Sequence, residues 1–86
     1  MILHITEVKY LQDYQLWLRF DDGSEGIVDL APELWGDMFE PLKDKTLFSQ
    51  VKLDKVLKTV GWPNGADFAP EFLHGLLSRN IEGRHE

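Results

Sequence analysis

Hydrophobic and polar residues alternate along the first third of the chain, which is typical of half-buried antiparallel strands. The alternation is most regular over residues 14–20, and residues 4–11 and 26–30 carry it in weaker form. The Asp-Asp-Gly-Ser sequence at 21–24 predicts a hairpin turn, because Gly23 tolerates a positive φ. These segments predict a three-stranded meander. In the first strand, the residues expected to alternate against Glu7 and Lys9 are Thr6, Val8 and Tyr10.

Shorter elements are expected in the middle of the chain. Residues 31–35 have the pattern of a single helical turn with proline near its start. Residues 41–51 predict a short helix, within which Asp44 is a candidate cap for the part that follows. Residues 53–60 predict a fourth strand, which ends before Pro63 because proline cannot continue a strand ladder.

A last helix is predicted from Pro70 to about Ser78. Its apolar stripe consists of Phe72, Leu73, Leu76 and Leu77. Together the elements predict a small single α+β domain, with a curved antiparallel sheet of three to four strands, one or two short helices and a C-terminal helix.

The predicted domain spans residues 1–79. Residues 80–86 carry no periodicity and few apolar groups, so this tail is expected to fray. Its Ile81-Glu82-Gly83-Arg84 sequence matches a protease recognition sequence that expression vectors use, and a vector remnant is one interpretation of part of the tail.

Composition narrows the classes of function. The chain of 86 residues has a formal net charge of −6, and an acidic surface repels phosphate backbones, which argues against direct nucleic-acid binding. It contains no cysteine, which excludes disulfides, thiolate nucleophiles and zinc–thiolate sites. The apolar runs are too short to cross a bilayer, and no signal peptide is recognisable, so a cytoplasmic protein is expected.

No catalytic motif is present. The three histidines, His4, His74 and His85, are too scattered to suggest a metal site. No serine lies in the context of a nucleophile elbow. We therefore expect neither an enzyme nor a bound metal or cofactor.

The tryptophans suggest an interaction surface instead. Trp17 and Arg19 share the strand face opposite the apolar one, and aromatic residues and arginine often anchor interfaces. An alternative of equal weight is that Trp17 packs beneath the segment around Trp35. Trp35 and Trp62 lie beside turn residues, where a tryptophan more often closes the edge of a core. The candidate interaction residues are Trp17, Arg19 and Trp35, and exposed strand edges also suggest a homodimer.

Several motifs occur together in an order that resembles the bacterial domain of unknown function 2442 family, over residues 4–75. They include Phe20-Asp21-Asp22-Gly23, Val28-Asp29-Leu30 and Phe39-Glu40-Pro41-Leu42. The most specific block, here termed the family signature, consists of Trp62, Pro63, Asn64, Gly65, Asp67 and Pro70. The resemblance implies a small α+β fold without established enzymatic activity. Some similar domains precede a helix-turn-helix domain, and others resemble one half of a two-gene toxin–antitoxin pair.

The family signature has two interpretations. In the architectural one, Asn64-Gly65 forms a turn, Asp67 accepts backbone N–H groups ahead of the helix that Pro70 starts, and Trp62 covers the junction. In the other, the block binds a ligand or a partner.

Two functions are therefore carried forward. The leading hypothesis is a protein-interaction or regulatory module, an antitoxin-like subunit of a two-gene pair that binds a basic partner protein. The alternative is a transcriptional regulator or accessory DNA-binding subunit. That role requires a basic stripe, and the candidate lysines, which aspartates interrupt, are Lys43, Lys45, Lys52, Lys55 and Lys58.

Overall fold

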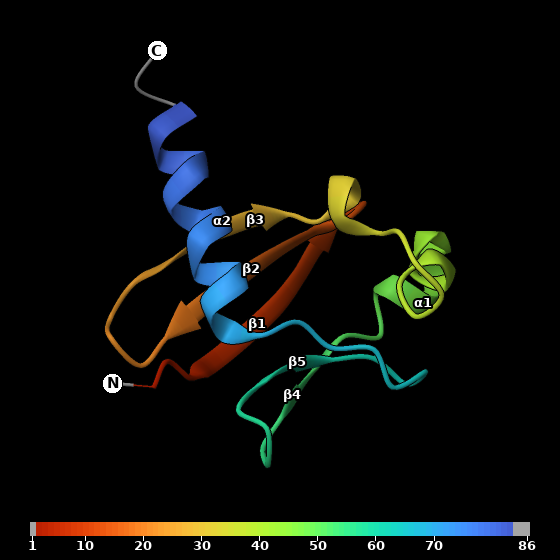
Figure 1. Cartoon of the computed structure of the whole chain (residues 1–86), viewed down its shortest axis with the longest axis horizontal. Helices are drawn as coiled ribbons and strands as arrows, with labels where there is room; N and C mark the ends of the chain where they lie inside the picture. Colours follow the sequence, from red (N-terminus) through yellow and green to blue (C-terminus); the bar gives the residue numbers. More distant parts are fainter. Residues whose placement is uncertain (1, 84–86) are drawn as a thin grey trace.

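Strands β1 (Ile5–Gln12), β2 (Gln15–Phe20) and β3 (Glu25–Asp29) form the predicted antiparallel meander, in the order β1-β2-β3. The computed structural model describes residues 2–83, with the side chains of residues 2–77. Figure 1 shows helix α2 (Pro70–Gly83) crossing one face of this sheet, with the β4–β5 hairpin alongside β1. The small α+β fold class predicted from the sequence is confirmed.

The alternation in β1 is interrupted by a bulge, which the sequence pattern did not reveal. Ile5 pairs with Phe20 and Glu7 with Arg19, so that Thr6 is the extra residue. Ile5 is buried while Thr6 is exposed, which corrects the expectation that Thr6 shares a face with Val8. The bulge brings Ile5 into the core because it changes the phase of the alternation.

The predicted fourth strand over residues 53–60 is wrong. The segment instead forms a short hairpin of β4 (Lys52–Asp54) and β5 (Thr59–Gly61). The Asp54 carboxylate accepts the backbone N–H groups of Val56 and Leu57, each at 2.9 Å. Lys58, at φ 59°, completes the reversal. An aspartate that binds backbone amides two and three residues ahead stabilises a turn at the expense of a continuous strand.

The predicted helix over residues 41–51 is divided in two. The 3₁₀ helix η2 (Glu40–Lys43) ends at Asp44, which has an extended backbone, and α1 (Lys45–Phe48) follows it. The Asp44 side chain accepts the Thr46 amide at 2.9 Å, which confirms the predicted cap. The turn predicted over residues 31–35 is the 3₁₀ helix η1 (Ala31–Glu33).

Helix α2 extends five residues beyond Ser78, to Gly83. No proline or glycine stops it between these two positions, and residues 80–83 continue the helix. Residues 84–86 lie outside the described part of the chain. The predicted apolar stripe is corrected at one position: Leu73, Leu76 and Leu77 are buried, whereas Phe72 is 39% exposed.

One hydrophobic core lies between the sheet, α2 and the segments that follow β3. Phe48 is fully buried at one end of it and makes edge-on contacts with Tyr10 and Tyr14, at centroid distances of 6.0 and 5.3 Å. At the other end Gly26 of β3 leaves room for Leu77, since a Cβ at this position would lie 2.4 Å from the Leu77 Cδ1 atom. This close approach sets the position of α2 on the sheet.

Candidate functional site

The turn of the family signature, residues 62–67, is closed by its own backbone. The Trp62 amide donates to the Ala66 carbonyl at 3.0 Å, and the Gly65 amide donates to the Trp62 carbonyl at 3.0 Å. Gly65 has φ +91°, a conformation that glycine adopts without steric cost. The Asn64 carboxamide accepts the Ala66 amide at 3.1 Å and donates to the Met38 carbonyl at 3.0 Å. Asn64 therefore shapes the turn and also ties it to the segment before η2.

Trp62 is an architectural residue. Its side chain is 5% exposed, and its ring contacts Phe48 and Phe68 at centroid distances of 5.5 and 5.9 Å. The indole Nε1 donates to the Phe48 carbonyl at 2.8 Å, so the polar atom of the ring has a partner inside the core. This arrangement joins the signature turn to the end of α1.

Asp67 does not have the role that the sequence suggested. Pro70 begins α2 as predicted, but the Asp67 carboxylate accepts no N–H group among residues 2–77 and is exposed. The Asp67 backbone forms a bridge with Gly61 of β5, and this bridge holds Asp67 ahead of the helix. The residue that immediately precedes Pro70 is Ala69. Thr59 fixes the next residue, because its hydroxyl donates to the Phe68 carbonyl at 2.5 Å.

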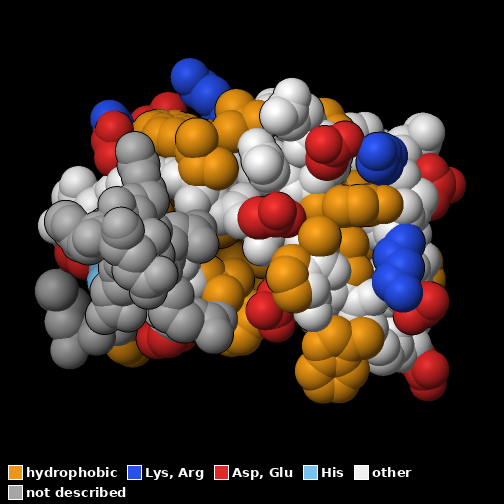
Figure 2. Space-filling view, turned by 90° about the horizontal axis from the view of Figure 1, so that it is seen from above, with side chains coloured by type: hydrophobic (Ala, Val, Ile, Leu, Met, Phe, Trp, Pro, Cys, Tyr) orange, Lys and Arg blue, Asp and Glu red, His pale blue; other side chains and the backbone are white. Residues whose placement is uncertain are grey.

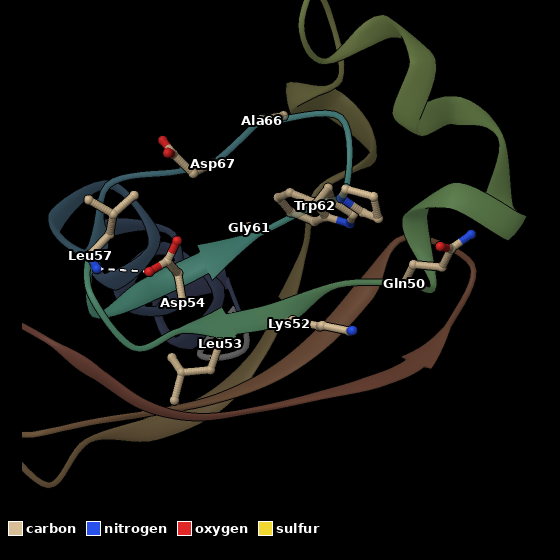
Figure 3. A pocket seen from close by; sticks show the side chains of 11 residues that line it. Gln50, Lys52, Leu53, Asp54, Leu57, Gly61, Trp62, Ala66 and Asp67 are labelled. Carbon is tan, nitrogen blue, oxygen red and sulfur yellow. Dashed lines mark hydrogen bonds between the residues drawn. The ribbon is translucent and has the colours of Figure 1, made fainter.

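A hollow of about 440 Å³ lies beside the signature turn (Figure 3). Gly61 forms its floor, between Lys52 of β4 and Asp67 in the paired ladder. Figure 3 shows Asp54 at one end, hydrogen-bonded to the Leu57 amide. Within residues 2–77 no group of three histidine, aspartate or glutamate side chains could hold a metal ion.

A second hollow, here termed the apolar groove, lies between the segment after η1 and the start of α2. It has a volume of about 490 Å³, and its large apolar residues are Trp35, Met38, Phe39, Phe68 and Phe72. The Phe39 and Phe68 rings are stacked with their centroids 4.5 Å apart, and the Phe68 and Phe72 rings are stacked with their centroids 5.5 Å apart. Trp35 is 69% exposed, so it does not close the edge of the core as the sequence suggested. Large aromatic side chains thus reach solvent together at one place.

Figure 2 shows a face of the molecule on which hydrophobic side chains, in orange, reach the surface beside acidic ones, in red. The carboxylates that line the apolar groove are those of Glu33, Asp37 and Asp67. Asp67 lines both the groove and the hollow of Figure 3, so it lies at the boundary between the two.

Trp17 and Arg19 lie together on the outer face of the sheet, away from the apolar groove. The Lys9 ammonium and the Arg19 guanidinium lie 5.3 and 5.6 Å from the centroid of the half-buried Trp17 ring. Arg19 also pairs with Glu25 at 2.8 Å and with Glu7 at 3.2 Å. The hydrogen bond and charge of Glu25 raise the pKa of Arg19. The charges on this face are therefore matched within the sheet.

Two of the five candidate lysines form ion pairs with carboxylates of the fold. Lys43 pairs with Glu40 at 3.2 Å, and Lys45 pairs with Asp13 at 3.0 Å. The Asp13 hydrogen bond and charge raise the pKa of Lys45. The remaining lysines belong to the β4–β5 hairpin and its turn, and they are Lys52, Lys55 and Lys58.

Comparison with known families identifies the chain. A model of a family described as protein of unknown function, DUF2442, matches residues 5–76. The chain belongs to the DUF2442 family. The match covers the meander, the β4–β5 hairpin and the first half of α2, so this DUF2442 domain includes the family signature, the hollow of Figure 3 and the apolar groove. No curated protein and no solved structure matches it. None of the described helices in this DUF2442 domain has the length and hydropathy that a bilayer crossing requires.

Sequence reasoning missed most of the apolar groove of this DUF2442 domain. Met38 and Phe39 lie in a segment without periodicity, and Phe72 was assigned to the core. The one feature of the sequence that indicates the groove is the apolar stripe of α2, which is wider than the core requires. Packing excludes Phe72 from the core because Leu73 and Leu76 already fill the inward face.

Proposed function

We propose that this DUF2442 domain is a protein-interaction module, a regulatory subunit of a two-gene pair, and that its partner protein docks in the apolar groove. The observation that supports this proposal is the joint exposure of three large apolar side chains in one groove: Trp35 at 69%, Met38 at 46% and Phe72 at 39%. Contiguous exposed apolar patches of this kind are typical of interaction sites.

The groove is suited to binding because hydrogen bonds anchor both of its sides. The Met38 carbonyl accepts from Asn64 of the signature turn, and the Phe68 carbonyl accepts from the buried Thr59. The Trp35 indole makes no hydrogen bond with the described residues, and 69% of the Trp35 surface is exposed to solvent. Tryptophan and other aromatic residues supply much of the binding free energy when a partner covers them.

The net charge of −6 suits a basic partner. Opposite net charges accelerate association, and salt weakens this acceleration. An association rate that is indifferent to ionic strength would contradict the electrostatic part of the proposal.

Co-purification with the protein encoded by the adjacent gene, followed by calorimetric titration, tests the proposal. Trp35→Ala is expected to weaken binding by about 2 kcal/mol, or roughly thirtyfold in Kd, with little change in stability. The matched control is Val56→Ala, because Val56 is 88% exposed on the β4–β5 turn, outside the groove. If Trp35→Ala and Phe72→Ala bind as tightly as the wild type, the groove is not the docking site. If the adjacent gene product does not associate, the two-gene role is wrong.

A further inference from the structure

The carboxylates of the chain differ in whether they have a partner. Most of those in residues 2–77 accept a hydrogen bond or form an ion pair within the fold. They are Glu7, Asp13, Asp21, Asp22, Glu25, Asp29, Glu40, Asp44 and Asp54. Four carboxylates in the same range have neither, namely those of Glu33, Asp37, Asp67 and Glu71.

Three of these four carboxylates line the same hollow. Glu33, Asp37 and Asp67 line the apolar groove, whereas Glu71 lies next to Phe72 in sequence, in the first turn of α2. Elsewhere on the described surface, acidic side chains are balanced by lysine, arginine, histidine or backbone N–H groups. At the groove they lie beside the exposed Trp35 and Phe72, and no lysine, arginine or histidine of residues 2–77 is among the lining residues.

This placement determines the chemistry of the occupant. Like charges that share a small area repel one another, and a docked cation between them removes that repulsion. An acidic or phosphate-bearing surface would add to it, so such surfaces are disfavoured at the groove. The occupant must also carry apolar side chains, because Phe39, Phe68 and Phe72 line the groove.

We infer that the apolar groove binds a basic, apolar segment of the partner protein, with its apolar side chains against Trp35 and Phe72 and its lysines or arginines beside Glu33, Asp37 and Asp67. The inference rests on the proposed function, because it specifies which segment chemistry the same groove accepts. Asp67 is the best placed of the three carboxylates, since its backbone is fixed by the bridge to Gly61.

The test uses a fluorescein-labelled amphipathic peptide of leucine and lysine, with fluorescence polarisation as the readout. A peptide in which glutamate replaces each lysine has the same apolar residues and the opposite charge. The wild-type domain is expected to bind the leucine–lysine peptide saturably and not to bind the leucine–glutamate peptide. Equal binding of the two peptides would overturn the inference, as would the absence of saturable binding of the leucine–lysine peptide.

Charge variants locate the effect. The variant Glu33→Gln, Asp37→Asn, Asp67→Asn is expected to raise the Kd at least about tenfold. The control Glu7→Gln, Asp13→Asn, Glu25→Gln changes the net charge equally, but at paired carboxylates outside the groove. It is expected to change the Kd by less than about twofold. Circular dichroism confirms that both variants fold.

The outcomes separate the two proposals. If the groove variant binds the leucine–lysine peptide as tightly as the wild type, or if the control weakens binding equally, recognition by the groove carboxylates is wrong. A loss of binding in Trp35→Ala alone would then leave the docking groove standing. If Trp35→Ala also binds the peptide with unchanged affinity, the inference is overturned, and so is the proposal that the groove is the docking site.

Discussion

Replacing Trp62 by phenylalanine tests whether the family signature is built around an internal hydrogen bond. The substitution keeps an aromatic ring at a position that is 5% exposed, but it removes the indole N–H that donates to the Phe48 carbonyl at 2.8 Å. Phenylalanine cannot replace that donor. The Phe48 carbonyl then keeps only the Val51 amide, which donates to it at 3.2 Å.

The expected loss of stability has two parts. The loss of one buried hydrogen bond costs about 0.5–1.5 kcal/mol. The smaller ring gives up contacts with Phe68 and leaves a void, at a cost of about 1 kcal/mol. The free energy of unfolding should therefore fall by about 1.5–2.5 kcal/mol in total. A domain of 86 residues is expected to have about 4–13 kcal/mol, so the change is large but need not prevent folding.

Urea unfolding followed by far-UV circular dichroism measures this loss without relying on tryptophan fluorescence. With a urea m-value of about 1–1.5 kcal/mol/M, the midpoint should fall by roughly 1.5 M. The matched control is Trp35→Phe at a 69% exposed position, where the free energy of unfolding should change by less than about 0.5 kcal/mol. Equal midpoints for Trp62→Phe and Trp35→Phe would refute the reasoning.

Three further substitutions probe the neighbouring structure. Gly65→Ala should destabilise the domain by about 1–2 kcal/mol, because alanine is strained at φ +91°; an unchanged thermal midpoint would contradict this. Thr59→Val should cost about 1–3 kcal/mol in urea unfolding, since it orphans the buried Phe68 carbonyl, whereas a neutral effect would mean that water reaches that carbonyl. Asp22→Asn tests how stability depends on pH in the acid range. The Ser24 hydroxyl and amide hold the pKa of Asp22 below its ordinary value of 3.8. This carboxylate therefore stabilises the fold above pH 3.8, and the stabilisation is lost as the pH falls through the lowered pKa. The stability difference between wild type and Asp22→Asn should therefore shrink as the pH falls below about 4, and a difference independent of pH would contradict the assignment.

The local elements follow largely from the sequence. Alternation in β2 depends on neighbours two residues apart, so the meander and its Gly23 turn could be predicted without knowledge of the core. The same holds for the Asp44 cap, in which an aspartate accepts the amide two residues ahead, and for the start of α2 at Pro70. Each of these features is decided by atoms close together along the chain.

Contacts distant in sequence decided the rest. The bulge at Thr6 depends on how β1 pairs with β2. Phe72 lies outside the core because other leucines of α2 fill the space against the sheet. The apolar groove joins the segment of Trp35 to the start of α2, and Asp67 reaches its rim because β5 holds its backbone. The sequence by itself determined the strands, the turns and the acidic balance, since these arise from local geometry and composition. Only the tertiary structure placed the exposed rings beside the unpaired carboxylates, because that placement depends on which surfaces the core leaves uncovered.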